Sequence, residues 1–337
     1  MGLRLKQHSK GNHDVCVTDA IAVLGLAALL DYGVGDPWGW PHPVQSLGWV
    51  IARWRDWTFR WLKSPIAQRI SGVVLTIVLV AGSAIASWAV FDAIARWSPL
   101  LSAGLQVILL ASCFAGRSLR EAAAEVLKPL VANDLPAARI ALSRYVGRDT
   151  DQLSATEIQR AVLETVTENA TDGVLAPLFY AGLSAVLGLG PVPLAIAYKA
   201  ASTLDSMVGY RRPPYTHLGW FPARSEDVWT WLPCRCVVLT IAILSGRPQQ
   251  VWQICCRDAP ADPSPNAGWS EAAYAAALGV QVGGDNHYQG QIVSKPLLGD
   301  PVRSLDTTVI QQALRLTRIA FLLWLAVITV LLLLQGR

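Results

Sequence analysis

Residues 164–205 read ETVTENATDGVLAPLFYAGLSAVLGLGPVPLAIAYKAASTLD, and this stretch decides the fold. Glu164, Glu168 and Asp172 recur every four residues, so on a helix their carboxylates line one face. The apolar run that follows, residues 174–198, is interrupted by GLGPVP. Gly and Pro at membrane depth are tolerated where they line a cavity inside the protein, so the pattern predicts a broken or re-entrant membrane helix. An ordinary kinked hairpin is the alternative.

The composition of the whole chain is that of a membrane protein. Of its 337 residues, 53% are hydrophobic and only 15% are charged, which argues against a soluble fold. The net charge of +4 comes without a basic block, so nucleic acid is not an expected partner. The six cysteines form no CxxC pair, so we expect neither a zinc site nor disulfides, in keeping with a reducing cytoplasm.

Further apolar runs lie on both sides of the opening stretch. Residues 1–14 form a polar tail, and residues 15–337 are predicted to form a single membrane-embedded domain. The run VVLTIAILSG (237–246) is too short to cross a membrane. The predicted fold is all-α and polytopic, with about four to six membrane segments and helical polar loops. The expected membrane segments are residues 15–30, 70–91, 99–115, 174–198 (broken) and 318–335.

Charge and tryptophan patterns predict how the chain meets the membrane. The Arg-bearing segments 31–69 and 116–172 are expected on the cytoplasmic side of the cell membrane, because positive charge favours that side. Within the first of them, Trp49, Trp57 and Trp61 lie at four-residue or eight-residue spacing. This spacing predicts an amphipathic helix in the headgroup region; packing of the tryptophans on neighbouring helices is the alternative.

The row of carboxylates also predicts a cation site. Glu164, Glu168 and Asp172 would repel one another on one helical face unless a cation or protons compensate their charge. Hard oxygen ligands of this kind suit Mg²⁺ bound together with substrate phosphates, and Asn169 offers a neutral oxygen beside them. A solvated helix face is the alternative.

Two more polar clusters follow along the chain. The first, YKAASTLDSMVGYRR (198–212), holds Lys199, Asp205 and Arg211. The planar guanidinium group of arginine binds phosphates well. The alternative is that these cations anchor the end of a membrane segment. The second cluster lies in CCRDAPADPSPNAGWSE (255–271) and holds Arg257, Asp258, Asp262, Asn266 and Glu271. The chain has no GxxxxGK[ST] phosphate loop, so an ATP site would be of another kind.

Four long motifs together resemble the CobD/CbiB family. They read GDPWGWPHPVQSLGWVI (35–51), ETVTENATDGVLAPLFYAGLS (164–184), AYKAASTLDSMVGYRRPPYTHLGWFPARSEDVWTWLPCR (197–235) and CRDAPADPSPNAGWSEAAYAAALGVQVGGDNHY (256–288). The match runs from about Leu24 to the last apolar segment and keeps the expected order. This family is the adenosylcobinamide-phosphate synthase of cobalamin biosynthesis.

The resemblance implies a membrane ligase that uses ATP and Mg²⁺. It would join a corrin carboxylate of adenosylcobyric acid to the amine of (R)-1-aminopropan-2-ol phosphate, or of aminopropanol. Under this interpretation we expect Glu168 and Asp172 to bind the metal, and Asp205, Lys199 and Glu164 to be catalytic. Substrate and phosphate groups would be held by Asp36, His42, Asn169, Arg211, Arg224, Arg257, Asp258 and Asn266.

Two other functions fit the same sequence features. A corrinoid-binding membrane sensor or transporter would also use a broken helix and charges at membrane depth, without ligase activity. A Mg²⁺-dependent transferase acting on a lipid phosphate would use similar carboxylates, although its paired acidic motifs are not reproduced in this sequence. The lipid bilayer is an expected partner in each case, and the sequence leaves a homo-oligomer open.

Overall fold

The computed structural model describes residues 2–35 and 43–336, with side chains for 18–35 and 45–336. The chain divides into two compact units. Unit 1 comprises Met1–Ala115, Ala176–Trp229 and Leu322–Arg337; unit 2 comprises Gly116–Leu175 and Thr230–Phe321. That the chain acts as one membrane-embedded domain from residue 15 onward stays a prediction.

Unit 1 consists of helices, and its core forms around α9. The helices that lie wholly in it are α1 (Gly2–Gly33), α2 (Pro43–Trp61), α3 (Pro65–Trp97), α4 (Pro99–Ala111), α8 (Ala176–Val186) and α9 (Val192–Val208). Helix α9 contacts α2, α3, α4 and α8. Its small residues Ala197, Ala200 and Ala201 are buried against Leu75 and Leu79 of α3, because small side chains allow close approach of two helices.

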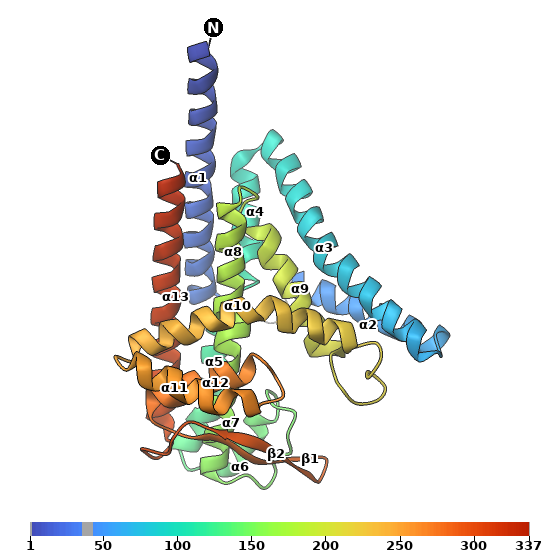
Figure 1. The fold of residues 1–337 in the computed structure, drawn as a ribbon, viewed down its shortest axis with the longest axis vertical. Helices are drawn as coiled ribbons and strands as arrows, with labels where there is room; N and C mark the ends of the chain where they lie inside the picture. Colours follow the sequence, from blue (N-terminus) through green and yellow to red (C-terminus); the bar gives the residue numbers. More distant parts are fainter. Residues whose placement is uncertain (1, 36–42, 337) are drawn as a thin grey trace. The chain divides into compact units, whose positions relative to one another are not determined.

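Residues 174–198 form a helical hairpin instead of a straight membrane helix (Figure 1). Helices α8 and α9 pack against each other, and residues 187–191 turn the chain between them. Gly188 (φ +75°) and Gly190 (φ +80°) adopt left-handed backbone conformations in this turn, which glycine reaches without steric cost. The interruption GLGPVP therefore ends one helix and allows the next to return.

Four helices among the described residues are long and apolar enough to cross a membrane: Pro65–Trp97, Pro99–Val131, Trp220–Leu244 and Thr307–Gln335. The second joins α4 to α5 (Gly116–Val131), and the last two are α10 and α13. Three of them contain predicted segments, namely 70–91, 99–115 and 318–335. The all-α, polytopic membrane fold is thus confirmed, and residues 15–30 lie within α1.

One membrane prediction was wrong. Residues 237–244 of the run VVLTIAILSG are the end of α10, which begins at Trp220 and continues through Pro233. Counting from the start of that helix gives 25 residues, more than the roughly 20 that a membrane crossing requires. The prediction failed because it treated the apolar run alone as the helix.

Helix α2 has the amphipathic character that the tryptophan spacing predicted. Trp49, Trp57 and Trp61 are exposed, and the guanidinium of Arg53 lies 5.4 Å from the ring centre of Trp49. Trp54, by contrast, points inward and donates a hydrogen bond from Nε1 to Ser71 Oγ at 2.9 Å. Exposed tryptophans beside cations are typical of a helix at the headgroup level of a membrane.

Unit 2 packs short helices around α7 and adds a β-hairpin. Its elements include α5, α6 (Leu135–Leu142), α7 (Ala155–Asn169), η1 (Ala170–Leu175), α11 (Pro248–Asp258), η2 (Ala259–Ala261), α12 (Ala267–Leu278), β1 (Val282–Tyr288) and β2 (Gln291–Leu298). Helix α7 contacts α5, α6, α12 and β1. Almost every residue of α12 is buried, and Tyr274 on it shares a hydrogen bond with Thr317 Oγ1 at 2.7 Å.

The antiparallel hairpin of β1 and β2 is the sheet that the sequence did not predict. Asp285 pairs with Ser294 and Gly284 with Lys295, and the register is irregular between Val282 and Gly284. Asp149 holds the tip, because its carboxylate accepts hydrogen bonds from the backbone N–H groups of Gln289 (3.0 Å) and Gly290 (2.8 Å). The hairpin is thereby fixed to the loop before α7.

Candidate functional site

Helix α7 carries two of the predicted carboxylates, and a capping box fixes where the helix begins. Ser154 Oγ accepts a hydrogen bond from Glu157 N at 3.3 Å, and Glu157 Oε2 accepts one from Ser154 N at 2.7 Å. This reciprocal arrangement satisfies two amide groups at the start of the helix. Glu164 and Glu168 then lie one turn apart on the same helical face.

The helix widens directly after Asn169. Residues Ala170–Leu175 form a π-helical turn, in which hydrogen bonds span five residues instead of four. Asp172 is therefore rotated away from the straight row that a regular helix would give it with Glu168. The wide turn is pinned from α12, because Ser270 Oγ donates to Thr167 O (2.6 Å) and forms a second hydrogen bond with Thr171 Oγ1 (2.7 Å).

Glu164 is buried, and both of its oxygens have partners. Arg148 Nη2 donates to Oε2, Gly283 N donates to Oε1 at 3.0 Å, and Arg160 Nε lies 3.9 Å from Oε1. Arg148 also donates from Nη1 to Asn286 Oδ1 at 2.7 Å. Glu164 thus fixes the β-hairpin against α7, and its charge is compensated by two arginines.

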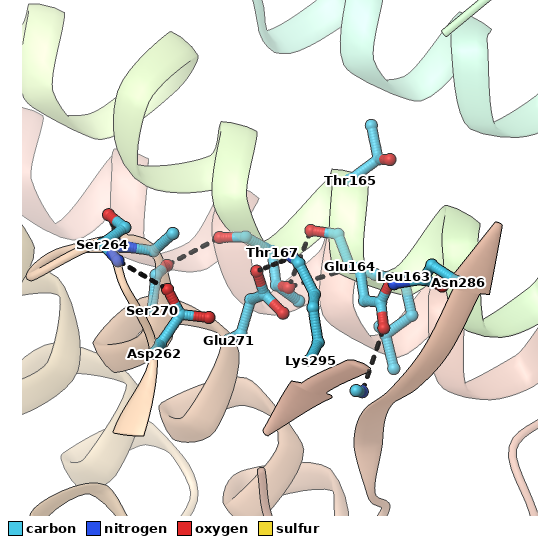
Figure 2. Close-up of polar contacts among 12 residues, drawn as sticks. Leu163, Glu164, Thr165, Thr167, Asp262, Ser264, Ser270, Glu271, Asn286 and Lys295 are labelled. Carbon is cyan, nitrogen blue, oxygen red and sulfur yellow. Dashed lines mark hydrogen bonds and ion pairs between the residues drawn. The ribbon is translucent and has the colours of Figure 1, made fainter. Parts of the chain in front are cut away.

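Glu271 is a buried carboxylate whose hydrogen-bonding capacity is unfilled. Its side chain is 0% exposed, and neither oxygen accepts a hydrogen bond from any residue that the structure describes. The ammonium of Lys295, on β2, lies 3.5 Å from Oε1. Figure 2 shows Glu271 of α12 facing α7, with Lys295 reaching toward it from the hairpin and Asp262 and Glu164 on either side.

Burial and mutual repulsion shift the protonation of this cluster. Burial raises the pKa of Glu271, the charge of Lys295 opposes that rise, and the carboxylates of Glu168, Glu164 and Asp262 add to it. Burial likewise raises the pKa of Glu168. For Lys295, burial lowers the pKa, but the surrounding carboxylates outweigh it and hold the pKa above its usual value. Lys295 is therefore charged at neutral pH.

The residue types in this cluster fit a bound cation. Carboxylate oxygens are the ligands that Mg²⁺ takes in proteins, and Glu271 has two buried oxygens without hydrogen-bond donors. Across residues 18–35 and 45–336, no three Asp, Glu, His or Cys side chains converge closely enough to hold a metal ion as they stand. In this conformation the positive charge nearest Glu271 Oε1 is supplied by Lys295.

The other predicted residues of unit 2 have protein partners. Asn169 is exposed and donates to Thr165 O at 2.9 Å. Arg257 forms ion pairs with Asp258 (2.6 Å) and Asp300 (2.8 Å), and Asp258 also accepts a hydrogen bond from Gly299 N at 2.9 Å.

Asn266 is buried and holds an arginine in place. Its Oδ1 accepts a hydrogen bond from Arg235 Nη1 at 2.7 Å. The guanidinium carbon of Arg235 lies 4.8 Å from the ring centre of Trp269 and 5.1 Å from that of Trp231, a geometry that stabilises a cation over aromatic faces. Asn266 therefore positions Arg235 between two indoles.

Four predicted residues belong to unit 1. Lys199 and Asp205 lie on α9 and are both partly buried, and Arg211 is exposed in the loop that follows α9. Arg224 is exposed on α10 and lies 3.7 Å from Asp227. Asp36 and His42 lie outside the described residues.

Sequence reasoning missed part of the cluster. Lys295 was not considered, because a lysine in the polar segment QIVSKPLLG has no neighbours in sequence that mark it. Arg148 and Asn286 were missed for the same reason. Glu271 and Asp262 were noted as members of one cluster, but no pattern in the sequence brings them to Glu168; only the packing of α12 on α7 does.

Comparisons with known proteins give one consistent result. The model of the CobD/Cbib protein family matches residues 24–317. The chain is 53% identical to the "Cobalamin biosynthesis protein CobD" of Synechocystis sp., over 90% of this chain and 89% of that one. It is 42% identical to the "Cobalamin biosynthesis protein CbiB" of Salmonella typhimurium, over 90% and 94%. No solved structure matches.

Proposed function

The chain belongs to the CobD/CbiB family and has a role in cobalamin biosynthesis, and on that premise we propose that it is an ATP- and Mg²⁺-dependent amide ligase. The substrates in this proposal are adenosylcobyric acid and (R)-1-aminopropan-2-ol phosphate, or aminopropanol itself. The product with the phosphorylated amine is adenosylcobinamide phosphate. The observation that carries the proposal is the carboxylate cluster formed by half-buried Glu168 and buried Glu271, because these carboxylates can receive a bound cation.

The reaction requires three kinds of assistance. A corrin carboxylate is a poor electrophile, so one of its oxygens first attacks the γ-phosphorus of ATP; ADP leaves and an acyl phosphate remains. The amine nitrogen, after loss of a proton from the ammonium, attacks the acyl carbon; the C–N bond forms and phosphate leaves. The protein must therefore hold phosphates, compensate their charge and accept a proton.

We assign the carboxylates of unit 2 to the cation side of this chemistry. Glu168 and Asp172 are the proposed ligands of Mg²⁺, which when bound neutralises charge on the transferring phosphoryl group. Glu164 keeps α7 and the hairpin together through Arg148 and Gly283. Arg257 with Asp258, and Asn266 with Arg235, stay proposed substrate-positioning residues, and Asn169 stays a proposed support for the metal site.

The residues of unit 1 are assigned to phosphates and to proton transfer. Lys199, Arg211 and Arg224 would compensate phosphate charge, and Asp205 would serve as a second metal ligand or as the base for the amine. Asp36 and His42 stay proposed substrate contacts. We place the polar segment 116–172 of unit 2 and the loops of the site on the cytoplasmic side of the cell membrane, where ATP is available. A cysteine outside the candidate membrane helices, such as Cys255, which is free and buried in the structure, stays reduced on that side.

The proposal is tested with purified protein in detergent. The protein is incubated with adenosylcobyric acid, aminopropanol phosphate and Mg·ATP, and the amide is detected by mass spectrometry. Asp172→Asn is expected to abolish turnover while expression and corrinoid binding stay near wild type; the matched carboxylate-to-amide control is Glu121→Gln, an exposed position on α5. Full activity in Asp172→Asn would remove that residue from the metal site.

The same assay separates the ligase from a corrinoid sensor or transporter. Tight corrinoid binding without an amide product, for both the phosphorylated and the free amine, would overturn the ligase proposal. Binding can be measured from the corrinoid absorbance that remains with the protein after gel filtration. Product that forms without ATP would equally contradict the proposed activation step.

A further inference from the structure

The Glu271–Lys295 pair is built in a way that protein stability alone does not explain. Buried ion pairs repay the loss of hydration only when hydrogen bonds fill the remaining lone pairs. Bonds between an ammonium and a carboxylate are normally about 2.7–2.9 Å long, whereas Lys295 Nζ lies 3.5 Å from Glu271 Oε1. Both oxygens of Glu271 remain without a hydrogen bond from any described residue. The site thus holds an ammonium loosely.

Lys295 enters the site from an element that is irregular at that point. It pairs with Gly284 in the hairpin, where the register shifts after Val282. Pro296 follows it and has no N–H group to donate to the strand ladder. The Lys295 side chain is 29% exposed, whereas that of Glu271 is 0% exposed. The lysine therefore lies between the buried carboxylate and solvent.

The chemistry of the lysine end matches the amine substrate. The last atoms of Lys295, Cγ, Cδ, Cε and Nζ, have the skeleton of 1-aminopropane. The proposed substrate has the same three-carbon amine with an oxygen on its middle carbon. A site that accommodates the end of Lys295 therefore accommodates a primary propylammonium group, and the carboxylate of nearby Glu168 adds to the attraction for the ammonium.

We propose that Glu271 binds the ammonium group of the amino alcohol substrate and that Lys295 occupies this position until the substrate displaces it. The proposal rests on the proposed ligase function, because it names the residue that receives one of the two substrates. Displacement moves the Lys295 ammonium away from Glu271, and this ammonium then becomes available to pair with the phosphate of the same substrate. Glu271 is then in direct contact with the reacting amine.

The first test uses binding alone, so it does not depend on catalysis. Lys295→Ala removes the same atoms that 1-aminopropane supplies. We expect 1-aminopropane, or aminopropanol phosphate, at a hundredfold excess over its Kd to raise the unfolding temperature of Lys295→Ala by at least about 5 °C. The double variant Lys295→Ala/Glu271→Gln should show no such rise. 1-Propanol and ammonium chloride at the same concentration are the matched control additives, and an equal rise with either would overturn the proposal.

The second test is kinetic. Glu271→Gln preserves side-chain shape and should raise KM for the amino alcohol phosphate by about 10-fold or more, with KM for ATP and for the corrinoid unchanged. Lys295→Met should lower KM for the unphosphorylated amine, because its competitor is gone; Lys128→Met on α5 is the matched control. An unchanged amine KM in Glu271→Gln, in protein that still forms the amide, would overturn this inference and leave the ligase proposal standing. If wild-type protein forms no amide but the rescue by 1-aminopropane occurs, the ligase proposal fails and the ammonium site stands.

Discussion

Replacing Arg148 by methionine should unfold unit 2 at a much lower temperature. Arg148 and Glu164 are 6% and 2% exposed, so water cannot compensate the charge of Glu164 when the arginine is lost. Removing one partner of a buried pair costs about 3–5 kcal/mol. Gly283 N still donates to Glu164, and Arg160 Nε still lies 3.9 Å from it. The loss should nevertheless fall in this range, because Glu164 loses its charged hydrogen-bond donor and Asn286 Oδ1 loses one of its two donors.

This free energy corresponds to a large shift in unfolding temperature. Unit 2 contains about 150 residues, and for a domain of this size 1 kcal/mol corresponds to roughly 2–4 °C. Arg148→Met should therefore lower the unfolding temperature by roughly 6–20 °C. A thiol-reactive fluorescent dye can report it after the exposed Cys256 has been labelled in the folded protein, because Cys234 and Cys255 are buried in this unit and react only when it opens.

The neighbouring Arg144 provides the matched control. It forms an ion pair with Glu125 in which the two side chains are 60% and 39% exposed, and exposed pairs contribute only about 0–1 kcal/mol. Arg144→Met should therefore shift the transition by at most a few degrees. Equal shifts for the two variants would refute the reasoning, because they would show that burial of the Arg148–Glu164 pair does not determine its contribution.

Three further predictions concern pH, the hairpin and helix packing. Burial and the neighbouring carboxylates raise the pKa of Glu271 in the folded protein, so its contribution to stability is full below about pH 4.5 and is lost as pH rises through the raised pKa; the unfolding temperature should fall as pH rises from 5 to 9, and less so in Glu271→Gln. Asp149→Asn should speed amide hydrogen exchange at Gln289, measured by mass spectrometry, because a carboxylate acceptor is lost. Gly219→Ala should prevent stable folding of unit 1, since its Cβ would lie 1.8 Å from a backbone carbonyl, whereas Gly104→Ala, with nothing within 4 Å, should retain wild-type thermal stability or exceed it.

The helical membrane architecture was predictable because hydropathy and helix length act locally along the chain. The apolar composition of residues 70–91 and 318–335 is sufficient to predict membrane helices. The true extent of α10 was not predictable by that rule, because its first half carries Glu226 and Asp227, Pro233 follows, and this part resembles a polar loop. The β-hairpin was not predicted, because its strands contain glycines and polar residues. The contacts that fix the hairpin come from α7 and from the loop before α7, which are distant in the sequence.

The candidate site was predictable only in part, and the reason is distance along the chain. Glu164 and Glu168 are neighbours on one helix, so their spacing reveals their common face. Glu271 and Lys295 reach them from residues more than a hundred positions later, through packing that no local pattern specifies. The π-helical turn was equally hidden, because ATDGVL is compatible with an ordinary helix, and the pinning of that turn by Ser270 is a tertiary contact.

The central claim is that ATP activates a corrin carboxylate for amide formation, and an oxygen label tests it most directly. Adenosylcobyric acid labelled with ¹⁸O in the reacting carboxylate is incubated with the protein, Mg·ATP and aminopropanol phosphate. The phosphate released is then analysed by mass spectrometry. An acyl phosphate pathway predicts one ¹⁸O atom in phosphate for each amide formed. Amide that forms while the released phosphate stays unlabelled would contradict the account.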